Sequence, residues 1–135
     1  MNKRHFILSL GSLPLLSACV PSGTINSQTE QPKIPQGKAL IVFYRPAAFA
    51  GGAIRFNINH AEGPVGQLIS GSVLYKTVSP GAQTFWSQVI SQDAITINAT
   101  AGQTYYVRGD VKMGLYAGRP SFTQVSEAQA LQELK

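Results

Sequence analysis

The chain has one cysteine, Cys19, among its 135 residues, and only two histidines. With one cysteine it can form neither an intramolecular disulfide nor a multi-cysteine zinc site. Charged residues make up only 13% of the chain, and its lysines and arginines form no long run. A nucleic-acid-binding domain would concentrate its basic residues in a patch or stripe. The composition therefore argues against a disulfide scaffold and against binding to nucleic acid.

Residues 1–18 have the pattern of a secretory signal peptide. Lys3 and Arg4 precede an apolar run over residues 6–16, and small residues follow it. The run is shorter than the roughly 20 apolar residues that span a bilayer. Pro14 would also interrupt a transmembrane helix. We therefore predict a segment that is removed after export.

The sequence Leu16-Ser17-Ala18-Cys19 resembles a bacterial lipoprotein box. The resemblance implies a diacylglycerol thioether on the Cys19 sulfur, cleavage before Cys19 and acylation of the new amine. Two or more acyl chains hold a protein stably at a membrane. Val20 in the next position, rather than an aspartate, resembles the outer-membrane sorting pattern. We expect a lipid-anchored protein of a Gram-negative envelope, on the outer membrane and facing the periplasm. The alternative is an ordinary signal peptide with an incidental cysteine.

The composition divides the rest of the chain into a tether and one domain. Residues 20–37 are mostly polar and contain Pro21, Pro32 and Pro35, which is typical of a flexible segment. From residue 38 onward, short β-rich runs alternate with glycine and proline. We therefore expect a signal peptide at 1–18, a lipidated cysteine and disordered tether at 19–37, and a β-domain at 38–135.

The apolar periodicity of the domain predicts strands and one helix. The run at 39–44 is nearly all apolar and predicts a strand that is buried on both faces. Further strands are expected at 53–59, 72–78, 84–90, 94–99, 104–112 and 122–125, with a short strand or edge at 65–69. Such spacing without intervening helices favours a single antiparallel β-sandwich of about seven strands. A positive φ is expected at Gly81, in the turn after Pro80.

A short C-terminal helix is expected to follow Ser126. Ser126 and Gln129 have the spacing of a capping box, and Leu131 and Leu134 lie on one helical face. A helix of this length is not stable alone, so we expect it to dock on a sheet edge or face.

Four blocks of the domain are similar to a known family. They are residues 39–46 with 49–52, 78–81, 101–108 and 112–120. Together they resemble an uncharacterised bacterial lipoprotein family, domain of unknown function 2846, over roughly residues 38–134. The resemblance implies a small β-sandwich like the prealbumin-like and PEGA-type domains. It implies no activity.

The residues offer little chemistry for catalysis. His60 is the only histidine left after cleavage, and we expect it in a loop at the end of a strand. The sequence contains no Gly-x-Ser-x-Gly motif, and the carboxylates are isolated from one another. We predict no enzyme, no metal and no cofactor. A hydrolase with a site assembled around His60 remains the opposing hypothesis.

Tyrosines and arginines form the candidate binding face, because this composition is enriched at binding hot spots. The residues predicted to share the face are Tyr44, Arg45, Tyr105, Arg108, Tyr116 and Arg119. Alternatively, the tyrosines are half-buried strand residues, and the arginines cover edges or pair with Asp110.

We expect a non-enzymatic interaction module whose partner is an envelope protein, peptidoglycan or lipopolysaccharide. An accessory or inhibitor lipoprotein of a secretion or surface machine is the main alternative.

Overall fold

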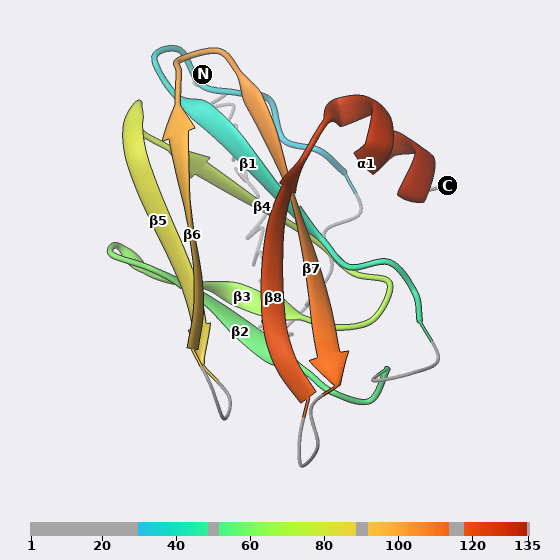
Figure 1. Cartoon of the computed structure of the whole chain (residues 1–135). Coiled ribbons are helices and arrows are strands. Elements are labelled where there is room, and N and C mark those ends of the chain that lie inside the picture. The colour runs from blue at the N-terminus through green and yellow to red at the C-terminus, as the bar shows by residue number, and fades with distance from the viewer. Residues whose placement is uncertain (1–29, 49–51, 89–91, 114–117, 135) are drawn as a thin grey trace, which may run out of the picture.

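The computed structural model describes residues 30–48, 52–88, 92–113 and 118–134. Cys19, the predicted signal peptide and most of the predicted tether lie outside these ranges, as does Tyr116. Two four-stranded sheets face each other (Figure 1). The β1 sheet contains, in spatial order, β4 (Val73–Val78), β1 (Ala39–Tyr44), β7 (Thr104–Met113) and β8 (Gly118–Val125). The β5 sheet contains β3 (Gly63–Leu68), β2 (Phe56–His60), β5 (Gly81–Gln88) and β6 (Gln92–Ala99).

The predicted mainly-β sandwich with a short C-terminal helix is confirmed, with two differences in detail. Eight strands are described rather than about seven. The sandwich is also not wholly antiparallel, because β1 pairs in parallel with β7 while it pairs antiparallel with β4. A parallel pair needs a long connection. Here the chain from β2 to β6, which includes the whole β5 sheet, lies between β1 and β7 and supplies that connection.

Each strand forms where alternating side chains can bury one face. In β1, however, every residue is buried, as its unbroken apolar sequence predicts. In β2, Phe56 and Ile58 are buried and Asn57 is exposed, although the strand begins three residues later than expected. The strand β5 begins at Gly81, whose φ of 118° lies in the region that glycine adopts at little cost, as predicted.

The sandwich core lies between the two sheets. Its largest contributions are aromatic and branched side chains from both inner faces: Ile41, Phe43, Phe56, Ile58, Phe85, Ile97, Val107 and Phe122. Phe43 contacts Phe85 edge to face, with ring centroids 4.8 Å apart. At the side of the sandwich, the Asp93 carboxylate accepts a 2.7 Å hydrogen bond from the backbone N–H of Phe122. This bond joins edge strand β6 of one sheet to edge strand β8 of the other.

The helix α1 (Glu127–Glu133) lies on the outer side of the β1 sheet (Figure 1). The Ser126 side chain accepts a hydrogen bond from the Gln129 backbone N–H, as the capping pattern predicts. The expected docking residues are wrong, however: Leu131 is 50% exposed and Leu134 39% exposed, while Ala130 is fully buried. The small alanine lets the helix backbone come close to the sheet.

A second apolar cluster, which we call the outer cluster, lies between α1 and the β1 sheet. It contains Leu40, Val42, Tyr44, Tyr106 and Ala130. Ile34, within the segment predicted as tether, also packs against it. None of the helices in the described ranges has the length and apolar character needed to cross a membrane.

Candidate functional site

The parallel pairing of β1 with β7 brings two of the predicted face residues together. Tyr44 lies opposite Arg108 on the outer face of the β1 sheet, beside the end of α1. Glu133, the last residue of the helix, completes the group. No spacing in the sequence relates Glu133 to Tyr44, since 89 positions separate them.

These residues form a hydrogen-bonded network that we call the C-terminal latch: Tyr44, Arg108, Asp110 and Glu133. The Tyr44 hydroxyl donates to Glu133 Oε2 at 2.7 Å. Arg108 Nη1 donates to Glu133 Oε1 at 2.7 Å, and its Nε donates to Asp110 Oδ2 at 2.8 Å. Bonds of this kind, with one or both partners charged, are stronger than neutral ones. The latch therefore fastens the helix to the sheet.

The latch shifts the pKa values of its own members. Burial and the hydrogen bond to Glu133 raise the pKa of Tyr44 far above its ordinary value. The hydrogen bonds from Tyr44 and Gln129 and the charge of Arg108 lower the pKa of Glu133. The hydrogen bond and charge of Asp110 raise the pKa of Arg108. Each shift favours the protonation state that these groups have at neutral pH, in which the hydrogen bonds of the latch are formed.

Arg45 is not on a surface, contrary to the prediction. It is only 3% exposed, and its Nη1 donates to the carbonyl oxygen of Ile54. The guanidinium lies 5.7 Å from the centre of the Phe56 ring. Burial lowers its pKa. Arg45 therefore holds the segment before β2 against the end of β1.

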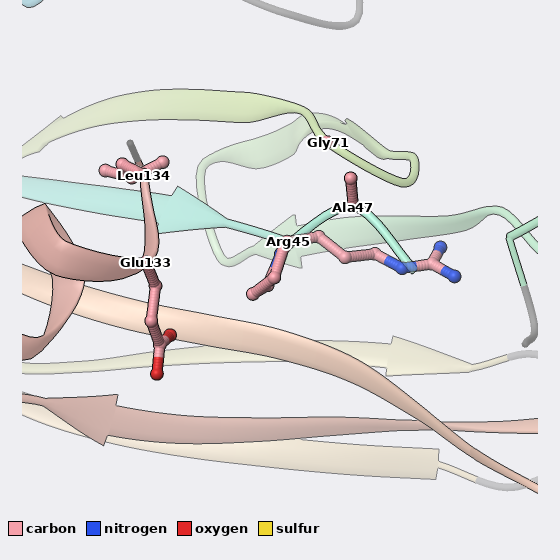
Figure 2. Close-up of a pocket in the computed structure, with 6 residues that line it drawn as sticks. Arg45, Ala47, Gly71, Glu133 and Leu134 are labelled. Atoms are coloured by element: carbon pink, nitrogen blue, oxygen red, sulfur yellow. The ribbon is translucent and has the colours of Figure 1, made fainter. Parts of the chain in front are cut away.

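A small pocket of about 140 Å³ opens beside the latch. Its lining residues are Arg45, Pro46, Ala47, Gly71, Glu133 and Leu134. Figure 2 shows the Arg45 side chain running away from Glu133, whose carboxylate also points out of the space between them. Both charged ends are already bound elsewhere, to Ile54 and to the latch. The pocket therefore offers no charged group to a ligand.

The remaining predicted residues do not join this group. Tyr105 lies on the opposite side of β7, packs against the sandwich core, and accepts a hydrogen bond from the Thr100 backbone N–H at 2.9 Å. Arg119 is exposed on β8, opposite Lys112. Tyr116 lies outside the described residues. Strand alternation places Tyr105 and Arg108 on opposite faces, so the predicted residues do not form one binding surface.

His60 is also not in a loop, contrary to expectation. It is the last residue of β2, is 5% exposed, and its ring stacks on Phe85 at 4.8 Å. The Nε2 atom lies 2.8 Å from Gln83 Oε1, and Nδ1 accepts from the Glu62 backbone N–H at 3.3 Å. These contacts satisfy the ring inside the core. Across the described residues, no group of three or more histidines, cysteines and carboxylates could hold a metal ion.

A different surface, the outer face of the β5 sheet, was not singled out from the sequence. We call it the polar face. Its outward-pointing residues are Asn57, Asn59, Pro64, Gln67, Ala82, Thr84, Trp86, Gln88, Gln92, Ala94, Thr96 and Asn98. The side chains on the opposite side of the same strands, including Phe56, Ile58, Phe85 and Ile97, fill the core.

The polar face has one large aromatic side chain near its middle. Trp86 is partly buried, and it lies opposite Asn59 on β2 and opposite Ala94 on β6. Beside it, the hydroxyls of Thr84 and Thr96 lie 2.8 Å apart across the β5–β6 pair. The alternation in residues 82–88 and 92–98 could have identified this face in the sequence.

A family model described as "Protein of unknown function (DUF2846)" matches residues 35–120. The chain belongs to this family. The matched segment of the DUF2846 chain contains β1 to β7 and the whole polar face, whereas α1 and Glu133 lie beyond it.

An uncharacterized protein of Haemophilus influenzae is similar to this DUF2846 chain. The two are 26% identical over 126 residues, which cover 89% of this chain and 74% of the relative. No solved structure matches the chain.

Proposed function

We propose that this DUF2846 protein is a non-enzymatic binding module, held by a lipid on Cys19 in the envelope of a Gram-negative bacterium. The observation that carries the proposal is a difference between the two outer faces of the sandwich, because one is packed against other elements and the other is exposed. On the β1 sheet, Ala130 of α1 and Ile34 pack against the apolar outer residues. On the β5 sheet, outward residues of β5 and β6 such as Thr84, Gln88 and Thr96 are exposed.

The titratable side chains bond to other residues of the chain, which supports binding rather than catalysis. His60 is packed on Phe85 and bonded to Gln83, inside the core. Glu133 and Arg108 are bonded to each other in the latch. A general base or nucleophile has to reach a substrate at hydrogen-bonding distance. These groups instead bond to their own chain.

A second candidate function is that of an accessory lipoprotein that docks on an acidic protein. Lys112 and Arg119 lie directly opposite each other at one end of the β1 sheet, and both are exposed. Like charges in this position repel. Within the described ranges, neither has an ion-pair partner. Met113, next to Lys112, is 63% exposed. An acidic partner would relieve the repulsion and cover the methionine.

The anchor and the partner can be tested together in native membranes. We expect the wild type to incorporate labelled palmitate and to sediment with membranes, and a Cys19→Ser variant to do neither. Palmitate incorporation by the Cys19→Ser variant, or none by the wild type, would contradict the anchor.

Crosslinking of the same membranes tests the accessory function. One dominant crosslinked protein that is lost in Arg119→Glu but kept in the control Arg55→Glu would support it. Arg55 is a suitable control because it is also an exposed arginine but precedes β2 in the other sheet. Equal crosslinking by both variants would refute docking through Arg119.

A further inference from the structure

We propose that the polar face binds an uncharged oligosaccharide, with Trp86 as the surface on which a sugar ring stacks. The inference rests on the proposed function and names the ligand class of the binding module. It places the site on the β5 sheet, away from the latch, the pocket and the Lys112–Arg119 pair.

Charge distinguishes the polar face from the rest of the described surface. None of the outward residues described on β2, β3, β5 and β6 is a lysine, arginine, aspartate or glutamate. Designed soluble proteins aim for about 25–35% charged residues on the surface, and even this weakly charged chain contains 13% overall. Arg55 lies at the margin, just before β2. A face without charges suits a neutral ligand, because burying an unpaired charge under a ligand costs much free energy.

The hydrogen-bonding character of the side chains also suits such a ligand. Asparagine, glutamine and threonine each both donate and accept. Sugar hydroxyls do the same, so they can pair with such groups in several orientations. Asn59 next to Trp86, together with Gln88 and Gln92 toward one end of the β5–β6 pair, supplies such groups around the indole.

The setting of Trp86 suits a sugar ring. Across the strand pair its neighbour is Ala94, whose methyl group is too short to cover the indole. The carbon–hydrogen face of a sugar ring can stack on an accessible indole, with aromatic contact area as the main gain. A protein partner is less well matched, because the centre of a protein interface is rich in apolar and aromatic residues. Here the face has one tryptophan, and most of the side chains around it are amides and hydroxyls.

The dimensions of the face favour a chain of sugars over a single one. Four strands at a spacing of about 4.8 Å cover about 15 Å, and the eight residues of β5 extend about 25 Å in the other direction. Polar side chains line β5 on both sides of Trp86, at Thr84 and Gln88. An extended neutral oligosaccharide would contact them together with the indole.

The test is titration of the full-length protein in a detergent without sugar headgroups. The probes are neutral tetrasaccharides of glucose and of N-acetylglucosamine, with tetragalacturonate as the acidic comparison. Trp86 is the only tryptophan of the chain, so its emission reports on this face alone. We expect at least one neutral probe to shift the emission and tetragalacturonate to leave it unchanged.

Calorimetric titration then compares variants. Trp86→Ala is expected to weaken binding of that probe at least tenfold, and Thr96→Lys, which adds a charge to the face at an exposed position, is expected to weaken it as well. Gln132→Lys, which adds the same charge at an exposed position of α1 on the other sheet, is the matched control and should bind as the wild type does. Thermal unfolding verifies that each variant is folded.

The results for sugar binding and for crosslinking together show whether the ligand or the whole binding module is wrong. If no neutral probe binds, or if Trp86→Ala and Thr96→Lys both bind like the wild type, the oligosaccharide site is refuted. If crosslinking at the same time finds a protein partner that depends on Arg119, the binding module stands and only its ligand is wrong. If neither a sugar nor a partner is found, both proposals fail.

Discussion

Removal of one hydroxyl group from the C-terminal latch tests how the helix is held. In Tyr44→Phe the ring stays in the outer cluster, while the 2.7 Å bond to Glu133 is lost. Tyr44 is fully buried, so water cannot replace its hydroxyl without opening the cluster. Glu133 keeps its bonds to Arg108 and Gln129. The variant therefore isolates a single interaction between α1 and β1.

The expected loss follows from the kind of bond. A hydrogen bond to a charged group contributes about 1.5–3 kcal/mol to stability. Because the Glu133 side chain is 22% exposed, we place the loss at the lower end, about 1.5–2 kcal/mol. For a domain of this size, each kcal/mol lowers the melting temperature by about 4–8 °C. We therefore expect Tyr44→Phe to melt roughly 6–16 °C lower than the wild type.

The assay is urea unfolding of the wild type, Tyr44→Phe, Glu133→Gln and the double variant. If the latch is as described, the two single effects are not additive, and the double variant is less destabilised than their sum. Hydrogen exchange of the α1 amides should accelerate in Tyr44→Phe more than exchange in the β5 sheet. A loss below about 0.5 kcal/mol, or strict additivity in the cycle, would refute the assigned role of the latch.

Two further predictions concern acid stability and packing. Since the folded state holds the pKa of Glu133 below its unfolded value, its contribution is present above the unfolded pKa of about 4.3 and is lost as the pH falls through the folded pKa. Urea midpoints measured between pH 7 and pH 2 should therefore fall less steeply in Glu133→Gln, and an unchanged profile would contradict the shift. In Gly109→Ala the new methyl carbon would clash with Leu68 Cδ2, so we expect a loss of about 1–3 kcal/mol in urea unfolding. Because Leu68→Ala removes the clashing atoms, Gly109→Ala should cost less in that background than in the wild type, and an equal cost in both backgrounds would contradict the clash.

The sequence predicted the strands because their signal is local. The unbroken apolar run of β1 and the alternation in β6 follow from which faces are buried, and both strands form nearly where expected. The predicted number of strands was close to the observed number for the same reason. Which strand pairs with which, however, is not encoded in a local pattern. The parallel pairing of β1 with β7 depends on the path of the whole chain and could not be read from either strand alone.

The candidate site was harder to predict because it depends on which face a side chain occupies. Arg45 was expected on a binding face and His60 in a loop, but both are buried, and their partners Ile54 and Gln83 follow from tertiary packing rather than from a local pattern. Leu131 and Leu134 looked like the docking face of the helix, yet close approach to the sheet required the smaller Ala130. The polar face was visible in the sequence, but only after the inward residues of β5 and β6 had been separated from the outward ones.

The place of β1 has a consequence for the order in which the fold can be completed. This strand is made first, but it lies between β4 and β7 and pairs with both. Until β7 has been synthesised, one side of β1 has no hydrogen-bonding partner, and its apolar residues have no complete core. Pairing between such distant segments also makes folding slow. If the protein is exported as proposed, this delay leaves the chain unfolded until most of it has left the ribosome, so that it can still pass through the membrane. β7 then pairs with β1 and completes the sheet on the far side of the membrane.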